Sequence, residues 1–254
     1  MSVLSKSPFL LAILGWITSC SLALAEEPGS LQVQLGLASS ANTSFYQEVG
    51  KEYYLFPLVI AEYQAFYLRG THGGYRFYEG DAGQTLGLEI RRTFDGYAGE
   101  DAKYLNGMNE RKAAWEAGLA YQTPWLGGEL KAQLLQDISD RHQGLSARVE
   151  FERLAWMNSS HLLTWYVGSE YWDTRKTEYY FGVETLETLP HRPSYRPEDS
   201  YTGFIGTNFF RQLTPKLTLI ISGEYLLASS AIADSPLTTR EDQWSAYGGI
   251  FYQF

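Results

Sequence analysis

The stretch Tyr247-Gly248-Gly249-Ile250-Phe251-Tyr252-Gln253-Phe254 alternates two kinds of side chain and ends on an aromatic residue. Counted by twos, one face of an extended strand carries mostly apolar residues, and the other face carries more polar ones such as Gln243 and Ser245. This pattern is typical of the closing strand of an outer-membrane β-barrel. We predict that the barrel-closing and assembly signal consists of Trp244, Ile250, Tyr252 and Phe254. The alternative is a soluble β-domain that ends in a strand.

The first 25 residues predict a cleavable export signal. Lys6 supplies the positive charge, residues 9–17 form an apolar core, and Ala23-Leu24-Ala25 is a small-residue cleavage site. The apolar core is too short to remain as a transmembrane helix. We therefore expect residues 1–25 to be removed and residues 26–254 to form the barrel domain. Cys20, the only cysteine, ends a loose lipobox, and cleavage before it would leave a lipidated N-terminus instead.

Composition narrows the class of protein. Aromatic residues make up 15% of the chain, and the sequence after residue 25 contains no apolar run of 18 residues. A helical membrane protein is therefore excluded. The net charge of −9 argues against a nucleic-acid partner, which would need a basic surface to neutralise phosphates.

Alternation with a period of two continues along most of the chain. Leu217, Leu219, Ile221, Tyr225 and Leu227 share one face of a predicted strand that is long enough to cross a membrane at a tilt. Short turns alternate with longer polar segments at 39–51, 95–110, 173–199 and 229–242, as in barrels with short periplasmic turns and long external loops. The fold class is thus all-β, a transmembrane antiparallel up-and-down β-barrel with both termini periplasmic. We predict twelve strands, with ten as the alternative, at 30–38, 53–61, 65–69, 73–79, 84–94, 111–122, 125–137, 144–155, 160–172, 200–212, 215–228 and 242–254.

The alternation also predicts which charged residues point into the lumen. Acidic and basic residues are interleaved there, so we expect a network of ion pairs, because a buried charge needs a partner. The predicted lumen network comprises Glu129, Lys131, Arg148, Glu150, Glu152, Glu170, Lys216 and Glu224, with Arg69, Arg76, Glu89, Arg91 and Glu116 also facing inward. A selectivity ring for a solute is the alternative. Aromatic residues near strand ends, predicted to face lipid, are Trp115, Trp165, Tyr171, Tyr225 and Trp244.

The sequence carries no recognisable catalytic or cofactor motif. The four histidines, His72, His142, His161 and His191, are not followed by a serine-containing motif of outer-membrane phospholipases. Neither a metal-ligand cluster nor a phosphate-binding glycine loop is present. We therefore expect no enzymatic activity, no metal and no cofactor.

Several motifs resemble the MipA/OmpV family of outer-membrane proteins. Tyr179-Tyr180-Phe181-Gly182-Val183 is similar to a Tyr-Tyr-Gly-Val segment of the family, with Phe181 as an insertion. Asp234-Ser235-Pro236-Leu237 and the aromatic end of the chain also match. The family-like loop residues are Tyr179, Tyr180, Gly182, Val183, Asp234, Ser235 and Pro236. The resemblance implies an outer-membrane scaffold, embedded in outer-membrane lipid, that links a lytic transglycosylase to a bifunctional murein synthase. A solute channel or a ligand-binding or adhesion barrel is the alternative.

Overall fold

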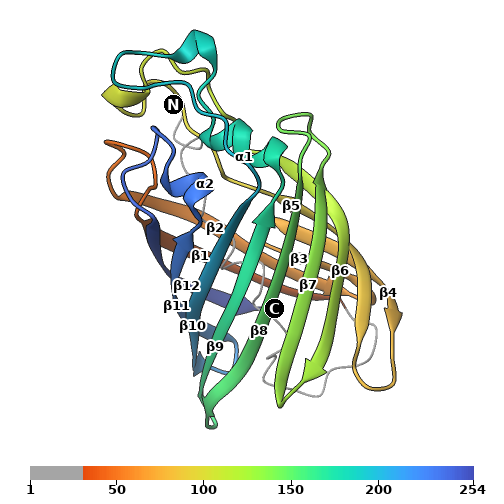
Figure 1. Cartoon of the computed structure of the whole chain (residues 1–254). Coiled ribbons are helices and arrows are strands. Elements are labelled where there is room, and N and C mark those ends of the chain that lie inside the picture. Colours follow the sequence, from red (N-terminus) through yellow and green to blue (C-terminus); the bar gives the residue numbers. More distant parts are fainter. Residues whose placement is uncertain (1–30) are drawn as a thin grey trace.

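The computed structural model describes residues 31–254, and within them it shows a closed antiparallel barrel of twelve strands (Figure 1). Each strand pairs with its neighbours in the sequence, and β1 (Gln32–Asn42) closes the barrel by pairing with β12 (Asp242–Gln253). No helix within the described residues is long and apolar enough to cross a membrane. The expected export signal, residues 1–25 with Cys20, lies outside the described residues.

The strands between these two have lengths close to those expected. Their bounds are β2 Glu52–Tyr63, β3 Phe66–Arg69, β4 His72–Glu79, β5 Thr85–Arg92, β6 Trp115–Trp125, β7 Gly128–Asp137, β8 Leu145–Met157, β9 His161–Trp172, β10 Ser200–Thr214 and β11 Leu217–Ala228. The connections carry the short helices η2 Lys103–Leu105, α1 Thr174–Phe181, η3 Thr185–Glu187 and α2 Ser230–Ala233. The alternative of ten strands is therefore not the observed one.

The period-two pattern sets which face of each strand meets lipid. In β11, Ile221, Tyr225 and Leu227 are exposed on the outside of the barrel, whereas Ser222 and Glu224 are buried in its interior. The same alternation places Ile250, Tyr252 and Phe254 on the outside at the end of the chain. An apolar outer face and a mostly polar inner face are what a membrane-spanning barrel requires, because lipid cannot satisfy polar groups.

One turn lies three residues beyond its expected position. The sequence predicts a turn at Thr123-Pro124 between the sixth and seventh strands, but the chain turns at Leu126 and Gly127. Both residues have positive φ angles, 47° and 73°, and a two-residue hairpin of this kind favours glycine. Pro124 remains in β6 without loss of a sheet hydrogen bond, since the pairing of β6 with β5 ends at Gln122.

The lumen has an apolar side and a charged side. Inward-facing residues of β1, β2, β11 and β12 form an apolar cluster, and charged side chains, from Glu62 of β2 to Glu224 of β11, occupy other parts of the lumen. The buried members of the apolar cluster are Ala38, Leu58, Ile60, Ile220, Tyr247 and Phe251. The charged network expected from the sequence therefore shares the lumen with an apolar cluster.

Substitutions at two glycines of the β1–β12 seam test how closely the strands pack where the barrel closes. A side chain at Gly36 would collide with the backbone carbonyl of Ile250 in the neighbouring strand, whereas a Cβ at Gly248 meets nothing within 4 Å. We expect Gly36→Val to destabilise the barrel by about 2 kcal/mol through overpacking. Gly248→Val should leave stability unchanged. Urea unfolding, monitored by heat-dependent gel mobility, measures both variants, and equal midpoints would contradict this account of the seam.

Candidate functional site

Five long connections fold together over one end of the barrel. We call them the cap, which comprises residues 43–51, 93–114, 138–144, 173–199 and 229–241, and we call this end of the barrel the loop end (Figure 1). Apolar side chains of four of them, all but 138–144, pack with residues of β9, β10 and β11 that face the lumen. The buried members of this core are Phe45, Tyr46, Tyr97, Ala102, Leu105, Met108, Tyr166, Trp172, Tyr180, Phe181, Val183, Phe204, Leu226, Ile232 and Leu237. The cap is thus a packed layer and not a set of free loops.

Helix α1 is the central element of the cap. The Asp173 carboxylate caps its N-terminus by accepting a hydrogen bond from the Lys176 backbone N–H at 3.0 Å. One face of the helix, which includes Lys176, Tyr180 and Phe181, is buried. Arg175 lies exposed on the same helix. The helix therefore presents one face to the barrel interior and another to the outside.

Lys176 reaches from α1 to a carboxylate on the barrel wall. Its Nζ lies 2.6 Å from Oε1 of Glu116, which is fully buried at the start of β6. Arg91 of β5 contacts the other oxygen, Oε2, at 2.6 Å. His142 Nε2 lies 3.4 Å from Oε1. Because His142 Nδ1 accepts a hydrogen bond from the Gly144 N–H, Nε2 carries the ring proton that faces the carboxylate.

Arg148 of β8 connects the next group of acidic side chains. Its guanidinium lies 2.9 Å from Glu150, 3.3 Å from Glu170 and 3.8 Å from Glu224. The guanidinium carbon also lies 3.7 Å from the centre of the Phe204 ring, which belongs to the apolar core of the cap. Arg148 thereby joins the charged side of the lumen to that core.

Lys131 of β7 contacts three carboxylates. Its Nζ lies 2.5 Å from Glu152, 3.5 Å from Glu150 and 3.6 Å from Glu129. Glu170 is also linked to the first group, because Arg91 contacts it at 3.4 Å. These contacts form one connected lumen network, whose members are Arg91, Glu116, Glu129, Lys131, Arg148, Glu150, Glu152, Glu170, Lys176 and Glu224.

Lys216 does not belong to this network, contrary to its expected position. It lies exposed in the two-residue turn between β10 and β11, with its Nζ 5.8 Å from the centre of the Tyr252 ring on the outside of the barrel. A turn residue has no fixed inward or outward face, so extending the strand alternation to Lys216 was the source of the error. Conversely, Lys176 was not expected. The Asp173 cap followed by a helix-compatible segment was the only sequence signal for it.

The family-like loop residues come together in the cap. Tyr180 lies in the apolar core, Gly182 ends α1, and Val183 pairs with Tyr195. Ser235 donates a hydrogen bond from its hydroxyl to the Phe181 carbonyl at 2.7 Å, which joins the two motifs. Asp234 ends α2, the Pro236 carbonyl accepts from the Gln47 side chain at 2.9 Å, and the Tyr179 hydroxyl accepts from the Lys112 N–H at 2.8 Å.

The barrel-closing residues lie on or just after β12. Trp244, Ile250 and Tyr252 belong to the strand, and Phe254 follows it. Ile250 pairs with Leu37 of β1 and with Leu219 of β11, so it contributes to the seam.

One contact between a serine and a histidine is explained by a turn. Ser160 Oγ lies 3.0 Å from His161 Nδ1 in the connection between β8 and β9. Asn158 Oδ1 lies 3.2 Å from the same nitrogen and accepts hydrogen bonds from the backbone N–H of both residues. This is the geometry of an asparagine-stabilised turn. Within residues 31–254, no group of three His, Cys, Asp or Glu side chains is placed to hold a metal ion.

Asp95 is a buried carboxyl group within the cap. Its surroundings include Phe45, Tyr46, Trp172 and Tyr180, which line the same small cavity. Burial is the main cause that raises the pKa of Asp95 to about 7, opposed by the positive charge of Lys176. The cap therefore contains an acid that titrates near neutral pH.

Comparisons with known proteins show which chains this one is similar to. The family model described as MltA-interacting protein MipA matches residues 35–254. The MltA-interacting protein of Escherichia coli strain K12 is 24% identical over 244 residues, which cover 93% of this chain and 94% of that protein. Outer membrane protein OmpV of Vibrio cholerae is 24% identical over 182 residues, which cover 71% and 70%. Among solved structures, Neisserial surface protein A is 11% identical, with a TM-score of 0.29 over 90% of this chain and 100% of that one.

The ion pair between Lys176 and Glu116 should stabilise the attachment of the cap to the barrel. Lys176→Met leaves the buried carboxylate with fewer partners and should weaken the attachment of the cap by about 3 kcal/mol. The double variant Lys176→Met/Glu116→Gln should recover part of this loss. Cleavage of segment 173–199 by proteinase K reports the opening of the cap. Arg175→Met, a change at an exposed neighbour on the same helix, is the matched control. Equal cleavage rates for Lys176→Met and Arg175→Met would show that Lys176 does not hold the cap.

The raised pKa of Asp95 predicts a pH dependence. Between the ordinary pKa of 3.8 and the folded value of about 7, the folded state binds more protons than the unfolded state, so stability falls as pH rises through this window. Asp95→Asn lacks this titrating group. As the pH rises from 5 to 8, the variant should therefore gain stability relative to the wild type. Unfolding free energies at both pH values measure the difference. Asp81→Asn, in an exposed turn, should show no such trend. If the difference in unfolding free energy between Asp95→Asn and the wild type is the same at both pH values, Asp95 does not have the raised pKa.

Proposed function

Because this chain belongs to the MipA family of outer-membrane proteins, we propose that it is a non-enzymatic scaffold that anchors murein-remodelling enzymes to the outer membrane. The partners that we propose are a lytic transglycosylase and, through it, a bifunctional murein synthase. The printed name of the Escherichia coli relative, MltA-interacting protein, supports the first partner.

The observation that carries the proposal is the closed loop end of the lumen. A packed apolar core lies over the charged network, and Lys176 ties the two together by a buried ion pair. A solute path would require this ion pair and the packing of α1 to break. The cap therefore argues against the solute-channel alternative and favours a barrel that serves as a membrane anchor.

The opposite end of the barrel offers a surface for a periplasmic partner. We call it the turn end, because its connections are short, as in the two-residue turns at 126–127 and 215–216. Short turns alone provide little docking surface. Charged side chains inside the turn-end mouth remain partly accessible, however: Glu62 is 34%, Glu129 26% and Arg76 21% exposed. We infer that a partner contacts this polar mouth together with the turns around it.

Insertion of a short epitope at each end of the barrel tests the proposal. An insertion between Asp81 and Ala82 places the epitope in an exposed turn at the turn end, and one between Pro190 and His191 places it at the loop end. The immobilised wild-type barrel should retain a lytic transglycosylase and a murein synthase from an envelope extract. The turn-end insertion should lose most of this retention, because it blocks the mouth, and the loop-end insertion should preserve it.

Two results would overturn the scaffold proposal. The first is that the wild-type barrel enriches neither enzyme over an unrelated outer-membrane barrel. The second is that the loop-end insertion, and not the turn-end insertion, abolishes retention. Heat-dependent gel mobility of each variant confirms that the barrel is folded before retention is compared.

A further inference from the structure

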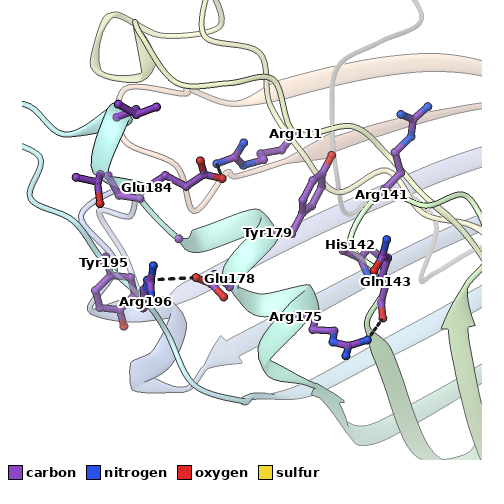
Figure 2. A pocket seen from close by; sticks show the side chains of 14 residues that line it. Arg111, Arg141, His142, Gln143, Arg175, Glu178, Tyr179, Glu184, Tyr195 and Arg196 are labelled. Atoms are coloured by element: carbon purple, nitrogen blue, oxygen red, sulfur yellow. Dashed lines mark hydrogen bonds and ion pairs between the residues drawn. The ribbon is translucent and has the colours of Figure 1, made fainter.

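A cleft on the outer surface of the cap is separate from the closed lumen and from the turn end. Its volume is about 680 Å³, and it is bounded by α1, by the connection 138–144 and by the segment that follows α1 (Figure 2). Ligand pockets for small molecules have volumes of roughly 300 to 1,000 Å³. The cleft is therefore large enough for a ligand of the size of a short oligosaccharide.

The cleft is basic although the chain as a whole is acidic. Four arginines line it, Arg111, Arg141, Arg175 and Arg196, against only two acidic residues, Glu178 and Glu184. The whole chain carries a net charge of −9. A concentration of guanidinium groups at this one place creates a local attraction for anions, and the planar guanidinium matches a carboxylate or a phosphate with two hydrogen bonds.

Two of the arginines are held in position by the fold. Arg111 is buried, and its Nη2 donates a hydrogen bond to Glu187 Oε2 at 2.9 Å, which fixes the guanidinium; its buried Nε has no hydrogen-bond partner among the described residues. The backbone of Arg141 is fixed because the Asp137 carboxylate accepts hydrogen bonds from the N–H groups of Arg141, His142 and Gln143 at 2.7 to 2.9 Å. The connection 138–144 is thus a turn fixed by hydrogen bonds, and it places Arg141 at the cleft.

The other two arginines make weak contacts that a ligand can replace. Arg175 donates to the Gln143 carbonyl at 3.4 Å, and Arg196 lies 3.7 Å from Glu178, with its side chain 87% exposed (Figure 2). Tyr179 and Tyr195 add aromatic surface to the same cleft. Aromatic rings beside charged donors suit a ligand that has both an anionic group and a ring with an apolar face.

We propose that this cleft binds an acidic saccharide, which presents a carboxylate or a phosphate to Arg141 and Arg175. The site faces the outside of the membrane when the long loops are external. Phosphorylated sugars of the outer leaflet and soluble acidic oligosaccharides share this chemistry. The proposal goes beyond the scaffold function, which uses the opposite end of the barrel, so either one stands if the other fails.

Binding of defined saccharides to the refolded barrel tests the proposal. The probes are trigalacturonate, glucose 6-phosphate and detergent-dispersed lipopolysaccharide, with galactotriose as the neutral reference, and isothermal titration calorimetry measures each affinity. At least one anionic probe should bind about tenfold or more tightly than galactotriose, because hydrogen bonds to charged groups are the stronger ones. The probe that binds identifies the source: carboxylate sugar, free phosphosugar or membrane lipid. Added salt should weaken this binding.

Variants locate the binding in the cleft. Arg141→Ala/Arg175→Ala should reduce the affinity for the bound probe by about tenfold or more. Arg240→Ala, a change at a partly exposed arginine elsewhere in the cap, is the matched control and should bind as the wild type does. Both arginines of the double variant are exposed, and heat-dependent gel mobility verifies its fold. Anionic probes that bind no better than galactotriose, or a double variant that binds like the wild type, would overturn the proposal.

Discussion

The carboxylate of Glu116 meets groups from three different parts of the chain. Lys176 comes from the cap, Arg91 from the neighbouring strand and His142 from the shortest cap connection. A buried carboxylate is stable only when partners compensate for its lost hydration, so these contacts must form together. The position of α1, and with it the apolar core of the cap, depends on this requirement. The same helix also supplies one side of the outer cleft, so the ion pair organises both faces of the cap.

The strands could be predicted from sequence because alternation is a local property. One face of each strand must suit lipid and the other the interior, and this requirement gave the twelve strands and the inward position of residues such as Arg148 and Glu150. The partners of those residues could not be predicted, because alternation assigns a face and not a register. Lys216 was misplaced for a related reason: alternation ends where the chain turns.

The cap was less accessible to sequence reasoning. Its segments are polar on average and were predicted only as loops, although Tyr180, Phe181 and Leu237 proved to form a buried core. Such a core depends on contacts between segments that are far apart in the sequence, for example that between Phe181 and Ser235. The basic cleft was missed for the same reason, since Arg111, Arg141 and Arg196 come from separate connections. The two ends of the barrel therefore differ: the loop end carries a packed cap, and the turn end has a polar mouth surrounded by short turns.

Single-channel recording tests most directly whether the cap closes the lumen. The refolded protein, shown to be a folded barrel by heat-dependent gel mobility, would be inserted into planar lipid bilayers under an applied voltage. The buried ion pair between Lys176 and Glu116 and the apolar core above the charged network predict no steady openings. Steady, long-lived openings of the folded wild-type protein would mean that the lumen conducts, and would contradict the account of a capped barrel that acts as an anchor.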